Sequence, residues 1–215
     1  MAKFSNVLSS AGARGLATTA RAAVRAVGAE LERRRGTRFV QRRIFSYRMF
    51  LDLEDRGISR TLLLFGQREL EHKVMLDRIL RPGMTILDIG ANIGYYALME
   101  LAKIQPGGTL IAVEPSPSNV ALLKRNLALN GYEGIEVHQA AISDRIARRA
   151  FFMSEMSNLN TFHDTGTGAL HLKGDTIDVD TTTVPEIMAD RPLDLIRMDV
   201  EGHEIEVLSG LLPAI

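Results

Sequence analysis

The chain has 215 residues, of which 46% are hydrophobic and 24% are charged, so it is long enough for one sizeable globular domain. It contains no cysteine, which excludes disulfides, thiolate metal sites and a cysteine nucleophile. No apolar run approaches the roughly 20 residues that span a bilayer, and the first residues lack the charged-then-apolar pattern of a signal peptide. A cytoplasmic location is therefore expected.

The 26 Lys and Arg balance the 26 Asp and Glu, but the two signs are unevenly distributed. Residues 1–48 hold 11 basic residues and only two acidic ones, Glu30 and Glu32, which leaves 15 basic and 24 acidic residues for 49–215. We expect a basic N-terminal arm over 1–48, helical or partly disordered, followed by the main domain. A helix within 18–35 is predicted from apolar residues at helical spacing: Leu16, Ala20, Val24, Val27 and Leu31.

Three roles for this arm remain open at this point. It can be a solvated arm or a helix docked on the domain, it can lie peripherally on an anionic membrane, or it can contact a phosphate backbone. Its composition also resembles that of a transit peptide. A nucleic-acid partner is the less favoured one, because few aromatic residues accompany the basic ones.

Beyond the arm, short apolar runs alternate with helical segments. Strands are predicted at 84–90, 109–114, 135–142 and 193–199, and helices at 95–104, 118–131 and about 202–212. A preceding helix at 68–80 is expected to bury Met75, Leu76, Ile79 and Leu80, and a hairpin-rich excursion with a strand at 175–184 is expected within 144–190. The fold class is therefore α/β, a Rossmann-like parallel sheet with helices on both faces. Ligands are expected at the carboxyl ends of its strands, where the strand order reverses.

The segment LDIGANIGYY is the most informative in the chain. A strand ends at Asp88, and a loop with the spacing G-x-N-x-G leads into the next helix. This spacing misplaces the third glycine of the dinucleotide fingerprint, which argues against a nicotinamide cofactor. It matches instead a loop for S-adenosylmethionine, with Asp88 near the ammonium group of the methionine moiety. The other predicted contacts of this loop are Gly90, Ala91, Asn92, Gly94 and Tyr95.

An acidic residue closes the second predicted strand. Glu114 follows Gly94 by 20 residues, and a carboxylate at this point can accept hydrogen bonds from both ribose hydroxyls. Pro115 fixes the exit from the strand, and Ala141, at the end of the third strand, is placed to flank adenine. A glycine loop alone indicates only a strand-to-helix turn, and a lone Glu114 only a helix charge. Together they predict a nucleoside cofactor, S-adenosylmethionine.

Three segments, MTILDIGANIGYYALMELA, AVEPSPSNVALLKRNLALNG and DLIRMDVEGHEIEVLSG, resemble the FkbM-type methyltransferases of the class I group, which use S-adenosylmethionine. The resemblance covers about Met49 to Gly210. It implies a Rossmann-like sheet and chiefly O-methylation of sugars, polyketides and other small molecules. It also implies further strands after the fourth strand and its helix. Because the chain ends at Ile215, we expect a C-terminally incomplete domain that lacks these strands.

The segment DLIRMDVEGHEIEVLSG places four ionisable residues after the fourth strand. Asp199 is expected at the cofactor edge and is the first catalytic candidate, either beside the sulfonium or orienting a substrate hydroxyl. Glu201 is the second, shared between helix capping and the site, whereas His203 and Glu204 are expected on the surface. The spacing of Asp199, Glu201 and His203 is not diagnostic of a metal, so no metal is predicted.

The predicted acceptor is a hydroxyl group of a small molecule or glycan. Polar residues of the excursion, Asn158, Asn160 and His163, can line an acceptor pocket, but turn formation is the preferred interpretation. Two alternatives stay open: a non-catalytic remnant of the cofactor fold, and a nucleic-acid methyltransferase that uses the basic arm.

Overall fold

The computed structural model describes residues 16–162 and 172–211, and it separates into two compact units, Met1–Arg68 and Glu69–Ile215. The boundary expected between residues 48 and 49 falls inside a strand, β2. Strand β1 (Phe39–Ile44) pairs antiparallel with β2 (Tyr47–Asp52) along its whole length. The last ten residues of the expected arm therefore belong to a hairpin that continues to Asp52, and its alternating side chains bury one face of each strand.

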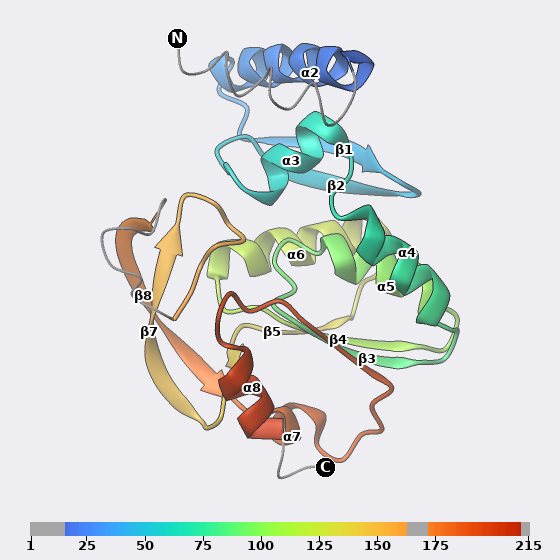
Figure 1. The fold of residues 1–215 in the computed structure, drawn as a ribbon, viewed down its shortest axis with the longest axis vertical. Helices are drawn as coiled ribbons and strands as arrows, with labels where there is room; N and C mark the ends of the chain where they lie inside the picture. The colour runs from blue at the N-terminus through green and yellow to red at the C-terminus, as the bar shows by residue number, and fades with distance from the viewer. Residues whose placement is uncertain (1–15, 163–171, 212–215) are drawn as a thin grey trace. The chain divides into compact units, whose positions relative to one another are not determined.

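Within its described residues, 16–68, the first unit combines this hairpin with two helices, α2 (Leu16–Arg34) and α3 (Ile58–Phe65) (Figure 1). Helix α2 confirms the helix predicted within 18–35. Helix α3 packs against both α2 and β2. The core of the unit is formed by buried apolar side chains from the hairpin and α3: Val40, Ile44, Tyr47, Met49, Leu51, Ile58, Leu62 and Leu63.

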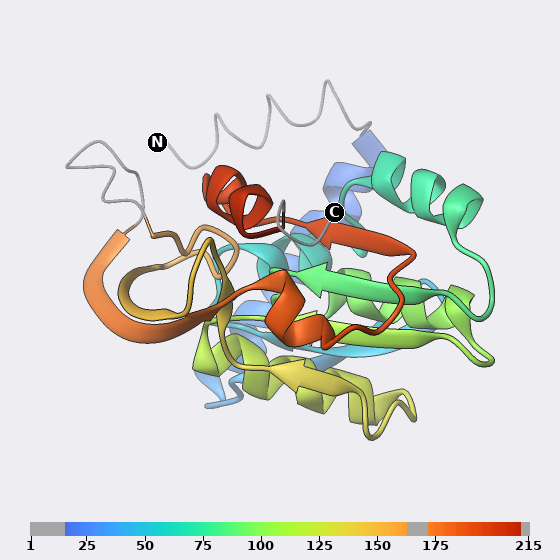
Figure 2. The ribbon, with the colours of Figure 1, turned by 90° about the horizontal axis from the view of Figure 1, so that it is seen from below.

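The second unit contains a parallel sheet of four strands, β3 (Thr85–Ile89), β4 (Thr109–Val113), β5 (Glu136–His138) and β9 (Leu195–Met198). Their order is β5-β4-β3-β9, so the chain moves outward from β3 through β5 and then returns to the other side of β3 (Figure 2). The strand order therefore reverses between β3 and β9, where a parallel sheet offers its ligand crevice.

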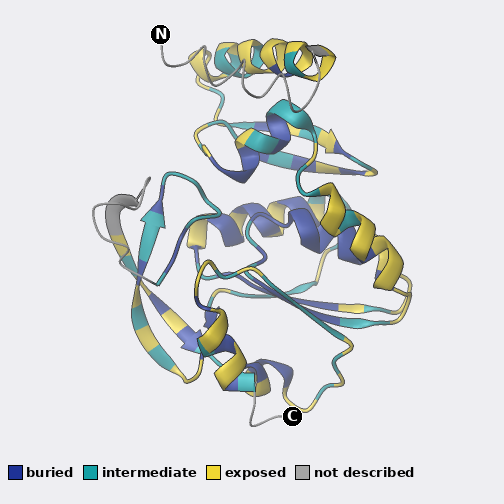
Figure 3. Cartoon of the chain, viewed as in Figure 1, coloured by how far each residue is buried: buried dark blue, intermediate teal, exposed yellow. Residues whose placement is uncertain are grey.

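Helices cover both faces of this sheet. On one face lie α4 (Leu70–Ile79), α5 (Tyr95–Ile104) and α6 (Pro117–Leu129), and on the other α7 (Val184–Met188) and α8 (Glu204–Leu211) (Figures 1 and 2). The central strands β3 and β4 are buried after their first residues, and the outer strands β5 and β9 are half-buried (Figure 3). This parallel sheet with helices on both faces confirms the Rossmann-like α/β fold. The core under α7 and α8 is formed by Leu87, Ile89, Ile111, Val113, Ile142, Val184, Ile187, Met188 and Val207.

A second sheet of three strands interrupts the alternation of strands and helices, in agreement with the hairpin-rich excursion predicted within 144–190. Its strands are β6 (Ala141–Ile142), β7 (Ala147–Ser154) and β8 (Leu172–Thr182), in the order β6-β8-β7. Strands β7 and β8 form a long antiparallel pair, and β6 runs parallel to β8. The third predicted strand, 135–142, is therefore two short strands in two different sheets.

The apolar face predicted for α4 is only half correct. Leu76 and Leu80 are buried, but Met75 and Ile79 are exposed, because α4 packs chiefly against one neighbour, α5. Within the described ranges 16–162 and 172–211, no helix is long and apolar enough to cross a membrane.

Candidate active site at the switch point of the parallel sheet

The glycine loop between β3 and α5 has the backbone that its sequence predicts. Gly90, Asn92 and Gly94 all have positive φ angles, of 78°, 50° and 90°. A Cβ atom at Gly90 would lie 2.1 Å from the carbonyl oxygen of Asp199, and one at Gly94 would lie 2.7 Å from Cδ1 of Leu123. Gly90 is therefore required for the close approach of its backbone to the end of β9. At Gly94 the neighbouring atom is the end of a flexible side chain, so the positive φ is the stronger reason for glycine.

Asp88 lies at the end of β3 and is fully buried. Its Oδ1 accepts a hydrogen bond from Nη1 of Arg197 at 2.9 Å, whereas its Oδ2 has no partner among the described residues. Burial raises the pKa of Asp88, and the guanidinium of Arg197 opposes this effect. Nη2 of Arg197 also donates to Oδ2 of Asp199 at 3.0 Å, so one arginine links the ends of β3 and β9.

Arg197 is not among the site residues predicted from the sequence. In the sequence, Arg197 stands out as a charged residue within an otherwise apolar strand, LIRM. A charged side chain in a buried sheet needs a partner of opposite charge. That partner is Asp88, on the adjacent strand and in register with it. The parallel pairing of β3 and β9 thus creates a contact between residues 109 positions apart.

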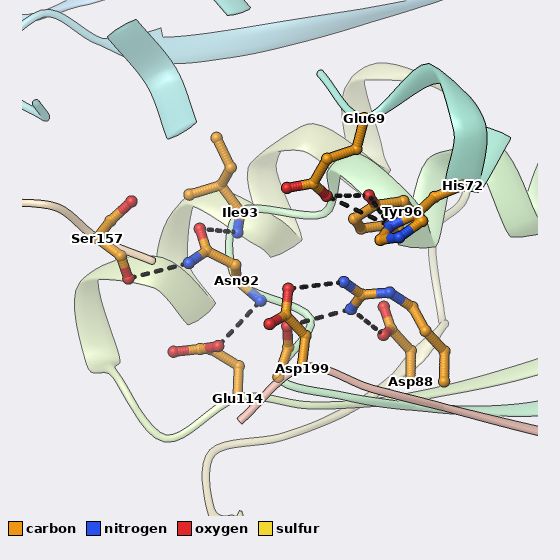
Figure 4. Close-up of polar contacts among 11 residues, drawn as sticks. Glu69, His72, Asp88, Asn92, Ile93, Tyr96, Glu114, Ser157 and Asp199 are labelled. Carbon is orange, nitrogen blue, oxygen red and sulfur yellow. Dashed lines mark hydrogen bonds and ion pairs between the residues drawn. The ribbon is translucent and has the colours of Figure 1, made fainter. Parts of the chain in front are cut away.

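Tyr96 covers the guanidinium of Arg197. The Cζ atom of Arg197 lies 3.9 Å from the centre of the tyrosine ring, within the range of a cation–π contact. The Tyr96 hydroxyl donates to the carboxylate of Glu69 and lies 3.0 Å from Nδ1 of His72 (Figure 4). Burial and the Glu69 carboxylate raise the pKa of Tyr96, so the phenol stays protonated. Both tyrosines that open α5 are buried, Tyr95 at 1% exposed and Tyr96 at 5%, and it is the Tyr96 ring that contacts Arg197.

Glu114, the predicted ribose ligand, reaches back from β4 to the glycine loop. Its Oε2 accepts the backbone N–H of Asn92 at 2.9 Å, and its Oε1 accepts the N–H of Ser116 and the side-chain amide of Asn119 at 3.0 and 3.1 Å. Burial nevertheless raises the pKa of Glu114 to about 7. The half-buried Pro115 leads directly to Ser116, the N-cap of α6. The structure therefore places Glu114 and the loop together, as the predicted nucleoside site requires.

A backbone carbonyl oxygen of the excursion within 144–190 is hydrogen-bonded to the glycine loop. The carbonyl of Ser157 accepts hydrogen bonds from the side-chain amides of Asn92, Asn119 and Asn160 at 2.9, 3.3 and 3.2 Å. Asn160 also accepts the backbone N–H of Ser154, so it organises the turn as predicted. His163, considered with it, lies outside the described residues.

The turn after β9 exposes both predicted catalytic carboxylates. The Asp199 side chain is 46% exposed and its N–H donates to the carbonyl of Ile89. Glu201 is exposed, has a φ of 44°, and its carbonyl accepts the hydroxyl of Thr161 at 3.0 Å. Helix α8 begins three residues later, at Glu204, which is exposed as expected. Glu201 therefore lies in the turn before the helix and not in its first turn.

The prediction of a surface position for His203 is wrong. His203 is 1% exposed, its Nε2 lies 3.1 Å from Oγ of Ser143, and its ring centre lies 4.6 Å from that of Phe162. The reason is the close packing of α8, where a Cβ on Gly210 would lie 2.2 Å from the carbonyl of Ser143. The histidine thus attaches the start of α8 to the segment after β6.

Ala141 does not end a strand of the main sheet. Strand β5 ends at His138, and Ala141 belongs to β6, where it pairs with Thr181. The residue is buried, and its predicted contact with adenine stays a prediction.

The charges at the switch point suit a cationic nucleoside cofactor. Asp88 and Asp199 share the single guanidinium of Arg197, and the buried Glu100 has both carboxylate oxygens without a partner among the described residues. Burial raises the pKa of Glu100 well above its usual value, which keeps it neutral. The group therefore carries an excess negative charge, and the unpartnered oxygen of Asp88 fits an ammonium group. No three His, Cys, Asp or Glu side chains within 16–162 and 172–211 converge as a metal site.

Comparison with known proteins supports one family. The sequence model of the methyltransferase FkbM domain matches residues 88–215, more than half of the chain. A protein named methyltransferase 1 from Beauveria bassiana is 28% identical over 144 residues, covering 59% of this chain and 57% of that protein. The 31-O-demethyl-FK506 methyltransferase FkbM of Streptomyces tacrolimicus is 28% identical over 160 residues, 61% of each chain. The chain thus spans about 60% of the length of these curated relatives.

Among solved structures, methyltransferase FkbM from Methylobacillus flagellatus aligns with a TM-score of 0.42 and 18% identity, over 73% of this chain and 40% of that one. The TYW2 protein of M. jannaschii, solved with AdoMet, aligns with a TM-score of 0.39 and 12% identity, over 67% of this chain and 86% of that one. The family assignment rests on the match over residues 88–215, which includes the glycine loop, Glu114 and Asp199. This chain belongs to the methyltransferase FkbM domain family.

Proposed function

We propose that the chain binds S-adenosylmethionine at the switch point between β3 and β9 and transfers its methyl group to a hydroxyl oxygen of a small molecule or glycan. One observation carries this proposal. The parallel pairing of β3 and β9 brings Asp88, Asp199 and the glycine loop to one edge, where two carboxylates share one guanidinium. The name of the Streptomyces relative, which refers to an O-demethyl substrate, supports oxygen as the acceptor atom.

The chemistry assigns distinct roles to the chain's residues. When bound, S-adenosylmethionine supplies an electrophilic methyl group on a sulfonium. Transfer of this methyl to the acceptor oxygen, with the carbon–sulfur electron pair staying on sulfur, would release the hydroxyl proton, and a carboxylate of the chain would take up that proton. Asp199 is the carboxylate that we assign to this step, because it is exposed at the site yet held by Arg197. Glu201, in the same turn, is the second candidate.

The first prediction concerns cofactor binding. Titration calorimetry of the full chain with S-adenosylmethionine and S-adenosylhomocysteine is expected to show saturable one-to-one binding of both. Glu114→Gln is expected to weaken the binding of both ligands, because a carboxylate accepts two ribose hydroxyls and an amide oxygen accepts them less strongly. Absence of heat for the parent chain at about 1 mM ligand would contradict the proposal.

Transfer is tested separately with a methyl-labelled cofactor and a panel of hydroxyl compounds that includes glycans and polyketides. Asp199→Asn is expected to bind the cofactor but to lower the transfer rate about 10²- to 10⁴-fold, the usual contribution of a positioned base. Cofactor binding without transfer to any hydroxyl compound would leave a binding module and refute the catalytic half of the proposal.

A further inference from the structure

Arg197 has hydrogen-bonding capacity that its protein contacts do not use. Its Nη1 donates to Asp88 and, at 3.5 Å, to the carbonyl of Gly90, and its Nη2 donates to Asp199. A guanidinium carries five N–H donors, so two of them, including the one on Nε, have no acceptor among the described residues. The side chain is 15% exposed, so part of it reaches the surface.

The position of the guanidinium is fixed from several sides. The Tyr96 ring stacks on it at 3.9 Å, and Tyr96 is itself hydrogen-bonded to Glu69. Two carboxylates hold its Nη atoms. A bound group therefore meets a guanidinium that is already oriented, which reduces the entropy lost on binding.

Asp88 supplies the complementary charge beside it. Its buried Oδ2 lacks a hydrogen-bond partner among the described residues, although Oδ1 is bound to Arg197. An unpartnered carboxylate oxygen and unpartnered guanidinium donors thus lie in one cluster. This pair of charges is complementary to a zwitterion, an α-amino acid group with adjacent ammonium and carboxylate.

We propose that Arg197 binds the carboxylate of the amino-acid moiety of S-adenosylmethionine, with Asp88 taking the ammonium group. This inference rests on the proposed function and adds a ligand residue that the glycine loop does not contain. Arginine suits this role because its planar donors match a carboxylate and it stays charged at all relevant pH values.

The test compares S-adenosylhomocysteine with its decarboxylated analogue, which lacks only the carboxylate. The parent chain is expected to bind S-adenosylhomocysteine about tenfold to 100-fold more tightly, the range for a hydrogen bond to a charged group. In Arg197→Gln this ratio of dissociation constants is expected to fall to within about threefold of unity, with Arg197→Lys in between. Affinity for 5′-methylthioadenosine, which lacks the amino-acid moiety, is expected to stay within about threefold of the parent value in both variants.

Arg191→Gln is the matched control. Arg191 also makes a two-point pair with a carboxylate, that of Glu136 at the start of β5, away from the switch point. Its substitution is expected to leave the ratio unchanged. Equal affinity of the parent chain for S-adenosylhomocysteine and its decarboxylated analogue would overturn the inference. This measurement needs no variant, so it remains decisive if Arg197→Gln does not fold. A parent chain that binds neither ligand would instead refute the proposed function.

Discussion

Single residues decide how the switch point is built, and Arg197 shows why some of them escape sequence analysis. Asp88 and Glu114 are found from the sequence because each ends an apolar strand. Arg197 lies inside such a strand, and its role depends on the register of β3 and β9. His203 was misjudged for a related reason, because its burial depends on the packing of α8 against the segment after β6.

Gly90→Ala is expected to destabilise the second unit by about 2–4 kcal/mol, because both the positive φ and the contact with Asp199 oppose a Cβ atom. The matched control is Gly83→Ala, where φ is 86° but no heavy atom lies within 4 Å of the added Cβ. Gly83→Ala is expected to lower the free energy of unfolding by only about 1 kcal/mol, the cost of placing a Cβ atom at a positive φ. Urea unfolding measures both values, and equal losses would show that the approach of Asp199 has no energetic effect.

At the scale of elements, helix α2 presents apolar side chains to solvent. Val24, Val27 and Leu31 are 73%, 62% and 51% exposed at helical spacing, within a helix that also carries Arg21, Arg25, Arg33 and Arg34. Apolar residues beside basic ones suit the interface of an anionic membrane. This arrangement favours the peripheral membrane contact among the roles expected for the arm.

We expect the chain to sediment with vesicles that contain phosphatidylserine and not with vesicles of phosphatidylcholine alone. A variant with serine at Val24, Val27 and Leu31 is expected to bind at least about fivefold less, because the insertion of each apolar side chain contributes to binding. It should unfold at the same temperature, since all three positions are exposed. Absence of vesicle binding together with concentration-dependent dimerisation would assign this surface to a second copy of the chain.

For the whole molecule, buried carboxylates make stability depend on pH. The folded state holds the proton of Glu114 more tightly than the unfolded chain, since burial raises its pKa from 4.5 to about 7. Its contribution is therefore complete below pH 4.5 and is lost as the pH rises through about 7. Asp88 and Glu100 shift in the same direction.

Glu114→Gln removes one of these groups. From pH 5 to pH 8 the free energy of unfolding of the parent chain is expected to fall more than that of the variant, by up to about 3 kcal/mol at 1.4 kcal/mol per pKa unit. Urea unfolding at the two pH values measures the difference. Parallel pH profiles would show that the carboxyl group of Glu114 titrates normally in the folded protein.

Much of the second unit follows from its sequence, because strong local signals mark its elements. Helix α5 matches the predicted helix over 95–104, between Gly94 and the Pro106 turn. The split of the predicted third strand into β5 and β6 was not foreseen, since neither Gln139 nor Ala140 interrupts the pattern as a glycine or proline would. The β1–β2 hairpin of the first unit was not predicted, because its many arginines obscured the alternation of apolar and polar residues.

The attachment of the excursion through the carbonyl of Ser157 has a consequence for divergence within the family. A main-chain oxygen is present whatever side chain occupies position 157, whereas its three donors are asparagine amides. Side chains of the segment 155–159 can therefore change while the anchoring oxygen remains. The constraint is carried instead by Asn92, Asn119 and Asn160, so the excursion can diversify without detaching from its scaffold.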